Sequence, residues 1–183
     1  MSDKLTNVYE SVNSILAKVN VNKIDPNSSD FESLPEGYYL SEVVKAEYEN
    51  FPDGSKAPRI KLQLKVVDDG LRVVINENGD STLEPISKSK GRMIFKYYRL
   101  TTVEEAERCI KDLLKFEGEN PGESLLERDY FTNEDLLVEA LEILEGSQIY
   151  VQNTITKKKD GESSSWINLL SWERATKLGL IDE

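Results

Sequence analysis

The chain of 183 residues contains no histidine and only one cysteine, Cys109. Histidine is the commonest general base and the commonest metal ligand in proteins, so its absence argues against both kinds of site. A lone cysteine without histidine also argues against a zinc centre, and it cannot form an internal disulfide. The sequence has no Gly-rich phosphate loop, no dinucleotide-binding fingerprint and no serine-nucleophile elbow. These absences predict that the protein is not an enzyme and needs neither a metal nor another cofactor. A magnesium site held by carboxylates alone stays open, because acidic residues are plentiful.

The sequence also has no apolar run near the ~20 residues that a membrane-spanning helix requires. Its first residues, MSDKLTNVYES, do not show the basic-then-apolar layout of a secretion signal. A single cysteine is typical of a reducing compartment. We therefore expect a cytoplasmic protein with no membrane partner.

Acidic residues outnumber basic ones, 34 to 23, which gives a net charge of -11 at pH 7. A charge of this sign argues against a protein that coats duplex DNA through bulk electrostatics. The charges are unevenly distributed, however. Residues 56–99 contain ten Lys and Arg against five acids, whereas residues 101–146 contain fourteen acids against four bases. Local fields decide what a groove attracts, so the basic segment remains a candidate for binding an anionic partner.

Five extended segments define the expected fold, with two helical segments between the third and the fourth. The second extended segment is the clearest, because apolar residues from Ile60 to Val66 alternate with polar ones over its whole length. Three strands, a helical segment and two further strands are the element order of an OB-fold. We therefore predict a mainly β (α+β) fold with a five-stranded OB-fold-like barrel. The expected strands cover residues 38–49, 60–67, 91–100, 148–156 and 164–172.

Composition divides the chain into three parts. Residues 1–33 are predicted to form an N-terminal helix and a linker, because apolar residues at helical spacing precede a stretch rich in Asn, Ser, Asp and Pro. Residues 34–173 are predicted to form the OB-fold-like domain, with a hairpin insertion around 69–90 and an acidic helical segment at 102–146. Residues 174–183 are expected to be a short C-terminal tail.

Basic and aromatic residues alternate on two of the expected strands, which is the pattern that a platform for single-stranded nucleic acid needs. Rings stack on bases with little regard to sequence, at ~1–3 kcal/mol per base, while cations follow the phosphates. A lysine-rich hairpin tip with a tryptophan nearby extends the pattern toward the C-terminus. We predict nucleic-acid binding by Arg59, Lys61, Lys65, Arg92, Lys96, Tyr97, Tyr98, Arg99, Lys157, Lys158, Lys159 and Trp166.

Each of these features also has a structural explanation. A lysine-rich outer strand face is common and protects a sheet edge, three lysines suit a solvated loop tip, and a tryptophan can plug a barrel mouth. Phe95 and Ile94 are expected to fill the barrel in part. Because alternate residues of a strand point to opposite faces, one of Tyr97 and Tyr98 must then face solvent.

A set of short motifs runs through residues 34–172: Leu34-Pro35-Glu36-Gly37-Tyr38, the Asp53-Gly54 turn, the alternating residues 60–67, Gly91-Arg92 before Ile94-Phe95 and Tyr97-Tyr98, Lys111-Asp112-Leu113-Leu114, and a closing basic hairpin. Together they resemble bacteriophage single-stranded-DNA-binding proteins of the OB-fold type. The overall acidity and the insertion around 69–90 depart from a minimal member of that family.

The resemblance implies binding of single-stranded DNA with little sequence preference, in phage replication or recombination. It implies replication or recombination proteins as partners, allows a homodimer, and places a phage-encoded protein in the host cell cytoplasm.

A second class of function is also open. The acidic segment from Glu104 to Glu145 predicts an acidic protein-interaction module, because it can occupy a basic site on another protein. One example is a phage factor that binds or inhibits a host or defence nucleic-acid enzyme. Such a module has no affinity for single-stranded DNA.

Overall fold

The computed structural model describes residues 33–157 and 163–181, and this part of the chain is mainly β. Its seven antiparallel strands form one open sheet, accompanied by three α-helices and a short 3-10 helix. The predicted N-terminal helix, Lys158 and Lys159 lie outside the described residues. The elements are β1 (Gly37–Glu49), β2 (Arg59–Val66), β3 (Gly70–Ile75), β4 (Ser81–Ile86), β5 (Met93–Arg99), α2 (Val103–Leu113), η2 (Arg128–Phe131), α3 (Glu134–Leu144), β6 (Gln148–Lys157), β7 (Ser163–Leu169) and α4 (Trp172–Lys177).

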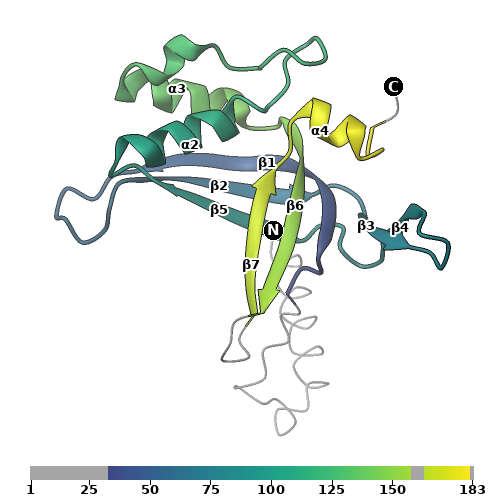
Figure 1. The fold of residues 1–183 in the computed structure, drawn as a ribbon. Coiled ribbons are helices and arrows are strands. Elements are labelled where there is room, and N and C mark those ends of the chain that lie inside the picture. The colour runs from purple at the N-terminus through teal and green to yellow at the C-terminus, as the bar shows by residue number, and fades with distance from the viewer. Residues whose placement is uncertain (1–32, 158–162, 182–183) are drawn as a thin grey trace, which may run out of the picture. The chain divides into compact units, whose positions relative to one another are not determined.

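Strand β1 is the longest strand and is shared between two parts of the sheet (Figure 1). Residues 37–42 pair with β6, and residues 41–49 pair with β2 on the other side. A register shift between Val43 and Lys45 changes the phase of the strand, so that Val43 and Ala46 are both buried. This bulge explains why neither alternating face of the segment is apolar along its whole length in the sequence.

Strands β2 and β5 form the clearest two-sided part of the sheet. The apolar residues Ile60, Leu62, Leu64 and Val66 of β2 are all buried, as the strict alternation in the sequence predicts. Antiparallel pairing brings β5 alongside, and its Ile94 joins the same core. The opposite side of both strands faces away from this core.

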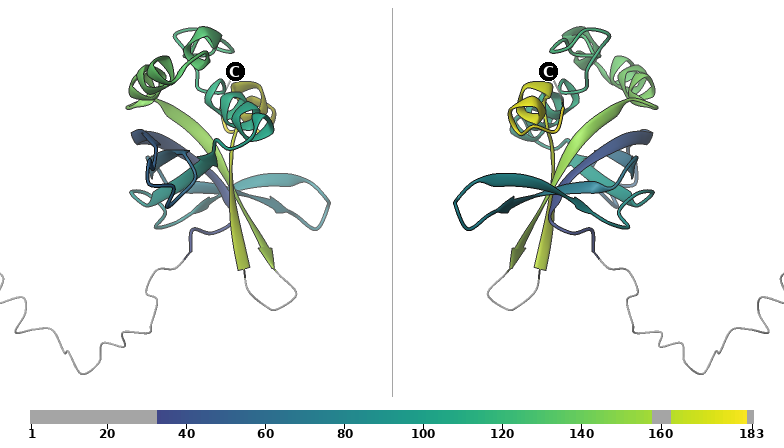
Figure 2. Two further views of the ribbon diagram at one scale, coloured as in Figure 1. Left: turned by 90° about the vertical axis from the view of Figure 1, so that its left-hand side faces the viewer. Right: turned by 90° about the vertical axis from the view of Figure 1, so that its right-hand side faces the viewer.

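Helices α2 and α3 pack on the core side of the sheet, where Figures 1 and 2 show them together. Thr102 caps α2 by accepting a hydrogen bond from the Glu105 main-chain nitrogen at 3.2 Å, as the capping-box spacing predicts. Asn133 caps α3 in the same way through the nitrogen of Leu136. The helices contribute these buried side chains to the core: Cys109, Leu113, Ala140, Leu141 and Leu144.

Two hairpins project from the sheet in different directions (Figures 1 and 2). The segment predicted as a hairpin insertion contains β3 and β4, which pair with each other along their whole length. Gly70, at the base of this hairpin, lies against the ring of Tyr39, where a Cβ atom would come within 2.2 Å of a ring carbon. The second hairpin is formed by β6 and β7.

The sheet differs from the expected barrel at one place. Within the described residues no ladder joins β5 to β7, so a closed five-stranded barrel is not formed. The last strand is also shorter than predicted. It ends at Leu169, and Ser171 then caps helix α4, which begins at Trp172 inside the segment expected to be strand and tail. Helix α4 is held by a second, smaller cluster that includes Leu170, Ala175 and Leu180.

Candidate nucleic-acid interface

The outward side of strands β2 and β5 forms a continuous basic and aromatic surface. The two strands pair so that Lys61 lies opposite Tyr97, and Gln63 lies opposite Phe95. Alternate residues of both strands point into the core, which leaves this side to solvent. We call it the β2–β5 face, and it consists of Arg59, Lys61, Gln63 and Lys65 of β2 and Met93, Phe95, Tyr97 and Arg99 of β5.

A row of large apolar side chains follows β5 along this face. Met93, Phe95 and Tyr97 are 42%, 48% and 49% exposed. Rings that are open to solvent on a strand surface are suited to stack on other flat rings. From the sequence, Phe95 is expected partly in the interior, and Met93 is not among the predicted contacts. The signal that identifies both is their phase, because they alternate with the buried Ile94 in the same way as Tyr97 does.

Arg59 connects three parts of this face. Its Nε donates to Glu49 Oε2 at 2.5 Å, and its guanidinium lies 4.7 Å from the ring centre of Tyr97 and 5.6 Å from that of Phe51. Phe51 belongs to the loop between β1 and β2, and Lys56 of the same loop also lies over its ring. Cation–π contacts therefore link this loop to the β2–β5 face.

A second carboxylate, Glu47 of β1, borders the same row of cations. Its Oε2 lies 3.6 Å from Lys61 Nζ, and its Oε1 lies 2.5 Å from Lys45 Nζ. The hydrogen bond from Lys45 holds the pKa of the Glu47 carboxyl below its usual range, so this carboxylate is ionised at neutral pH. Lys65 and Arg99, by contrast, form no ion pair with the residues that the structure describes.

Lys96 and Tyr98 point to the inner side of β5 and are not part of the β2–β5 face. Lys96 Nζ donates to the main-chain oxygen of Ile167 at 2.6 Å and lies 3.6 Å from Asp112 Oδ2. Tyr98 Oη donates to the same carboxylate oxygen at 2.8 Å. Burial lowers the pKa of Lys96 and raises the pKa of Tyr98. Strand alternation places both side chains inside, so we remove them from the predicted contacts.

Arg92 and Lys157 are also not part of this face. Arg92 precedes β5 and is half-buried, and its charge acts on Tyr39, whose pKa burial raises to about 12. Lys157 is exposed at the end of β6. Lys158 and Lys159 lie outside the described residues.

Trp166 lies on β7 and is 63% exposed. Its neighbour Ile167 packs against the core, so alternation directs Trp166 outward. Because Lys96 of β5 binds the main-chain oxygen of Ile167, β7 is held beside β5. Trp166 therefore extends the aromatic surface across the line where the sheet is open.

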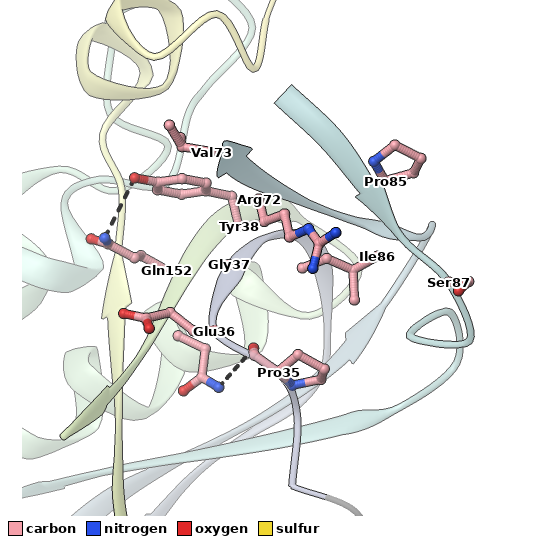
Figure 3. A pocket seen from close by; sticks show the side chains of 11 residues that line it. Pro35, Glu36, Gly37, Tyr38, Arg72, Val73, Pro85, Ile86, Ser87 and Gln152 are labelled. Atoms are coloured by element: carbon pink, nitrogen blue, oxygen red, sulfur yellow. Dashed lines mark hydrogen bonds between the residues drawn. The ribbon is translucent and has the colours of Figure 1, made fainter. Parts of the chain in front are cut away.

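A separate hollow of about 640 Å³ lies where β1 begins, between the β3–β4 hairpin and β6 (Figure 3). Tyr38 Oη accepts a hydrogen bond from Gln152 Nε2 at 3.5 Å on its wall. Arg72 also borders the hollow, but its guanidinium is paired with Glu84 at 3.1 Å. None of the predicted nucleic-acid-binding residues within the described ranges lines it, so we do not place the nucleic-acid site there.

Cys109 and the carboxylates were the remaining candidates for chemistry. Burial raises the pKa of the Cys109 thiol to about 12, which keeps it protonated and a poor nucleophile. In residues 33–157 and 163–181, no three His, Cys, Asp or Glu side chains are grouped to hold a metal ion.

None of the helices described in the structure has the length and apolar character needed to cross a bilayer.

Comparison with known proteins does not assign the chain to a family. The sequence matches no model of a known protein family. It matches no curated protein either. The functional argument therefore depends on the geometry of the β2–β5 face.

Proposed function

We propose that this protein binds single-stranded DNA through the β2–β5 face, without catalysis and with little sequence preference. The observation that carries the proposal is the row of half-exposed rings, Phe95 and Tyr97, directly beside the cations of β2. Bases stack on the rings, at ~1–3 kcal/mol per base, and phosphates follow the neighbouring cations. The bases of a duplex are already stacked on one another, so only a single strand can use the rings.

The strand order supports this proposal. Without the β3–β4 hairpin, the order β5-β2-β1-β6-β7 corresponds to strands 3-2-1-4-5 of an OB-fold. OB barrels are partly open, and they bind oligonucleotides on the face of strands 2 and 3 and with the loops 1–2 and 4–5. The β2–β5 face occupies this position, and Phe51 lies in the loop corresponding to 1–2. An OB-fold-like domain with its ligand surface here is therefore part of the proposal.

The resemblance in the sequence supplies the biological setting of the proposal. It favours phage replication or recombination as the process and the proteins of that process as partners. The distribution of charge agrees with this setting, because a chain with a net charge of -11 binds single strands only through a local basic surface.

Fluorescence anisotropy with labelled oligo(dT) of about 30 nucleotides, at low and high salt, tests the proposal. We expect binding that weakens as salt rises, and much weaker binding of a duplex of equal length. The double variant Lys65→Glu/Arg99→Glu reverses the two cations of the face that form no ion pair with described residues, and it should lose most of the affinity. The matched control, Lys111→Glu/Arg108→Glu on helix α2, makes the same change in net charge away from the face.

Two results contradict the proposal. Equal losses in both double variants show that net charge, and not this face, controls binding. If the unmodified protein does not bind oligo(dT) at low salt, the proposed binding of single-stranded DNA is wrong. A pull-down with the acidic helices α2 and α3 intact is then the next step, because it tests the protein-interaction module.

A further inference from the structure

Two carboxylates of β1 lie beside the path that phosphates take on the β2–β5 face. Glu49 accepts a hydrogen bond from Arg59 Nε at 2.5 Å, and Glu47 lies 3.6 Å from Lys61 Nζ. The β1–β2 register places each acid directly opposite its cation. The side chains of Arg59 and Lys61 are 28% and 20% exposed, so each cation is partly covered where it meets its acid.

Such pairing reduces the attraction of the face for any phosphate. Binding gains free energy from the counterions that are released when a cation neutralises a phosphate. A cation already neutralised by a carboxylate contributes less, because the phosphate has to compete with the acid. Lys65 and Arg99 form no ion pair within the described ranges and are left as the main phosphate contacts.

We propose that Glu47 and Glu49 determine the selectivity of this protein for single strands over duplex. This inference rests on the proposed function of the β2–β5 face. A duplex is held by phosphate contacts alone, whereas a single strand also stacks on Phe95 and Tyr97. Keeping the phosphate attraction low therefore weakens duplex binding more than single-strand binding.

The double variant Glu47→Gln/Glu49→Gln tests the inference, because glutamine keeps the shape and the acceptor oxygen while removing the charge. The matched control is Glu84→Gln/Glu173→Gln. It also removes two acids, one paired with an arginine (Arg72, 3.1 Å) and one with a lysine (Lys177, 2.5 Å), at positions outside the face. Both proteins are measured with oligo(dT) and with duplex of equal length over a range of salt.

We expect the Glu47/Glu49 variant to bind oligo(dT) roughly tenfold more tightly, which is what two partly exposed ion pairs of ordinary strength allow. Its dependence of log K on log salt should steepen by up to ~2.1 for the single strand and ~2.7 for the duplex, as three newly available cations predict. The third cation is Lys45, which Glu47→Gln also releases. The duplex should gain more affinity than the single strand, so the ratio of the two affinities should fall. The control should change neither slope.

Unchanged affinity of the Glu47/Glu49 variant overturns the inference, and so does an equal gain in the control, which indicates an effect of net charge. A gain in which the single-strand preference does not fall also overturns it. These results differ from a failure of the proposed function itself, in which neither the unmodified protein nor either variant binds oligo(dT) at low salt.

Discussion

The ammonium group of Lys96 on β5 donates to the main-chain oxygen of Ile167 on β7 at 2.6 Å, although no ladder joins these strands in the described residues. Lys115 makes the same kind of bond to the main-chain oxygen of Leu169 at 2.9 Å. Both lysines also meet the carboxylate of Asp112. Lys96 thus holds β7 beside β5 where a closed barrel has main-chain pairing, and Lys115, which follows α2, ties the end of β7 to the helical segment.

Replacing Lys96 by Met should therefore reduce stability without removing a phosphate contact. The variant loses a largely buried charged hydrogen bond, and Asp112 keeps Lys115 as a partner, so we expect a loss of ~1–3 kcal/mol in the free energy of unfolding in urea. The salt dependence of oligo(dT) binding should stay the same. Lys90→Met, at an exposed pair with Asp68, is the control and should change neither property. A shallower salt dependence in the Lys96 variant is evidence for a direct DNA contact and against this role.

The sequence predicts the mainly β class and the faces of β2, because that strand alternates strictly between apolar and polar residues. It predicts that the residues of β5 alternate between two faces, but not which of these faces points outward. In this strand the outward positions include Met93 and Phe95, while the inward positions include a lysine, so composition and exposure disagree. Lys96 is inside because Asp112 and a main-chain oxygen 71 residues away satisfy it, and neither partner is visible from local spacing.

In the candidate site, too, the sequence predicts the residues of single strands but not the contacts between strands. The cations Arg59, Lys61, Lys65 and Arg99 and the ring of Tyr97 were identified from the alternation of basic and aromatic residues, and the structure places all five on one face. The acids that pair with two of these cations lie on β1, and the β1–β2 register that brings them there is set by the bulge after Val43. A bulge of this kind leaves no clear signal in a single sequence.

Removal of single rings from the β2–β5 face should weaken DNA binding while leaving the fold in place. We expect Phe95→Ala and Tyr97→Ala each to reduce oligo(dT) affinity by roughly 5- to 150-fold, the equivalent of one stacked base. Both rings are about half exposed, so unfolding midpoints should change little. Ile75→Ala, at a 70% exposed site on the β3–β4 hairpin, is the control for loss of exposed apolar surface. If all three variants bind alike, the rings are not the stacking surface.

The buried thiol of Cys109 should make stability depend on alkaline pH. Burial raises its pKa from 9.0 to about 12, so the folded protein keeps the proton while the unfolded chain releases it. The protonated thiol therefore adds to the free energy of unfolding. This addition is complete below pH 9.0 and is lost as the pH rises to about 12. We therefore expect the stability difference between the unmodified protein and Cys109→Ala, measured in urea, to decrease over this interval. A stability difference that stays constant with pH contradicts the raised pKa of the Cys109 thiol. Tyrosine ionisation cancels in the comparison except at Tyr98, whose pKa burial raises and the charge of Cys109 raises further.

Trp166 should report directly on a bound strand, because it is 63% exposed beside β5 and the chain contains only two tryptophans. A base that stacks on its indole quenches its fluorescence, whereas Trp172, at the start of α4, lies apart from the β2–β5 face. We expect oligo(dT) to quench the emission of the unmodified protein and of Trp172→Phe, but not that of Trp166→Phe. Quenching that survives in Trp166→Phe and disappears in Trp172→Phe would move the DNA path from the open line between β5 and β7 to the surface around α4. The measurement thus locates the end of the DNA path. A strand that crosses from β5 to β7 quenches Trp166, whereas a strand that stays on β2 and β5 quenches none of the three proteins.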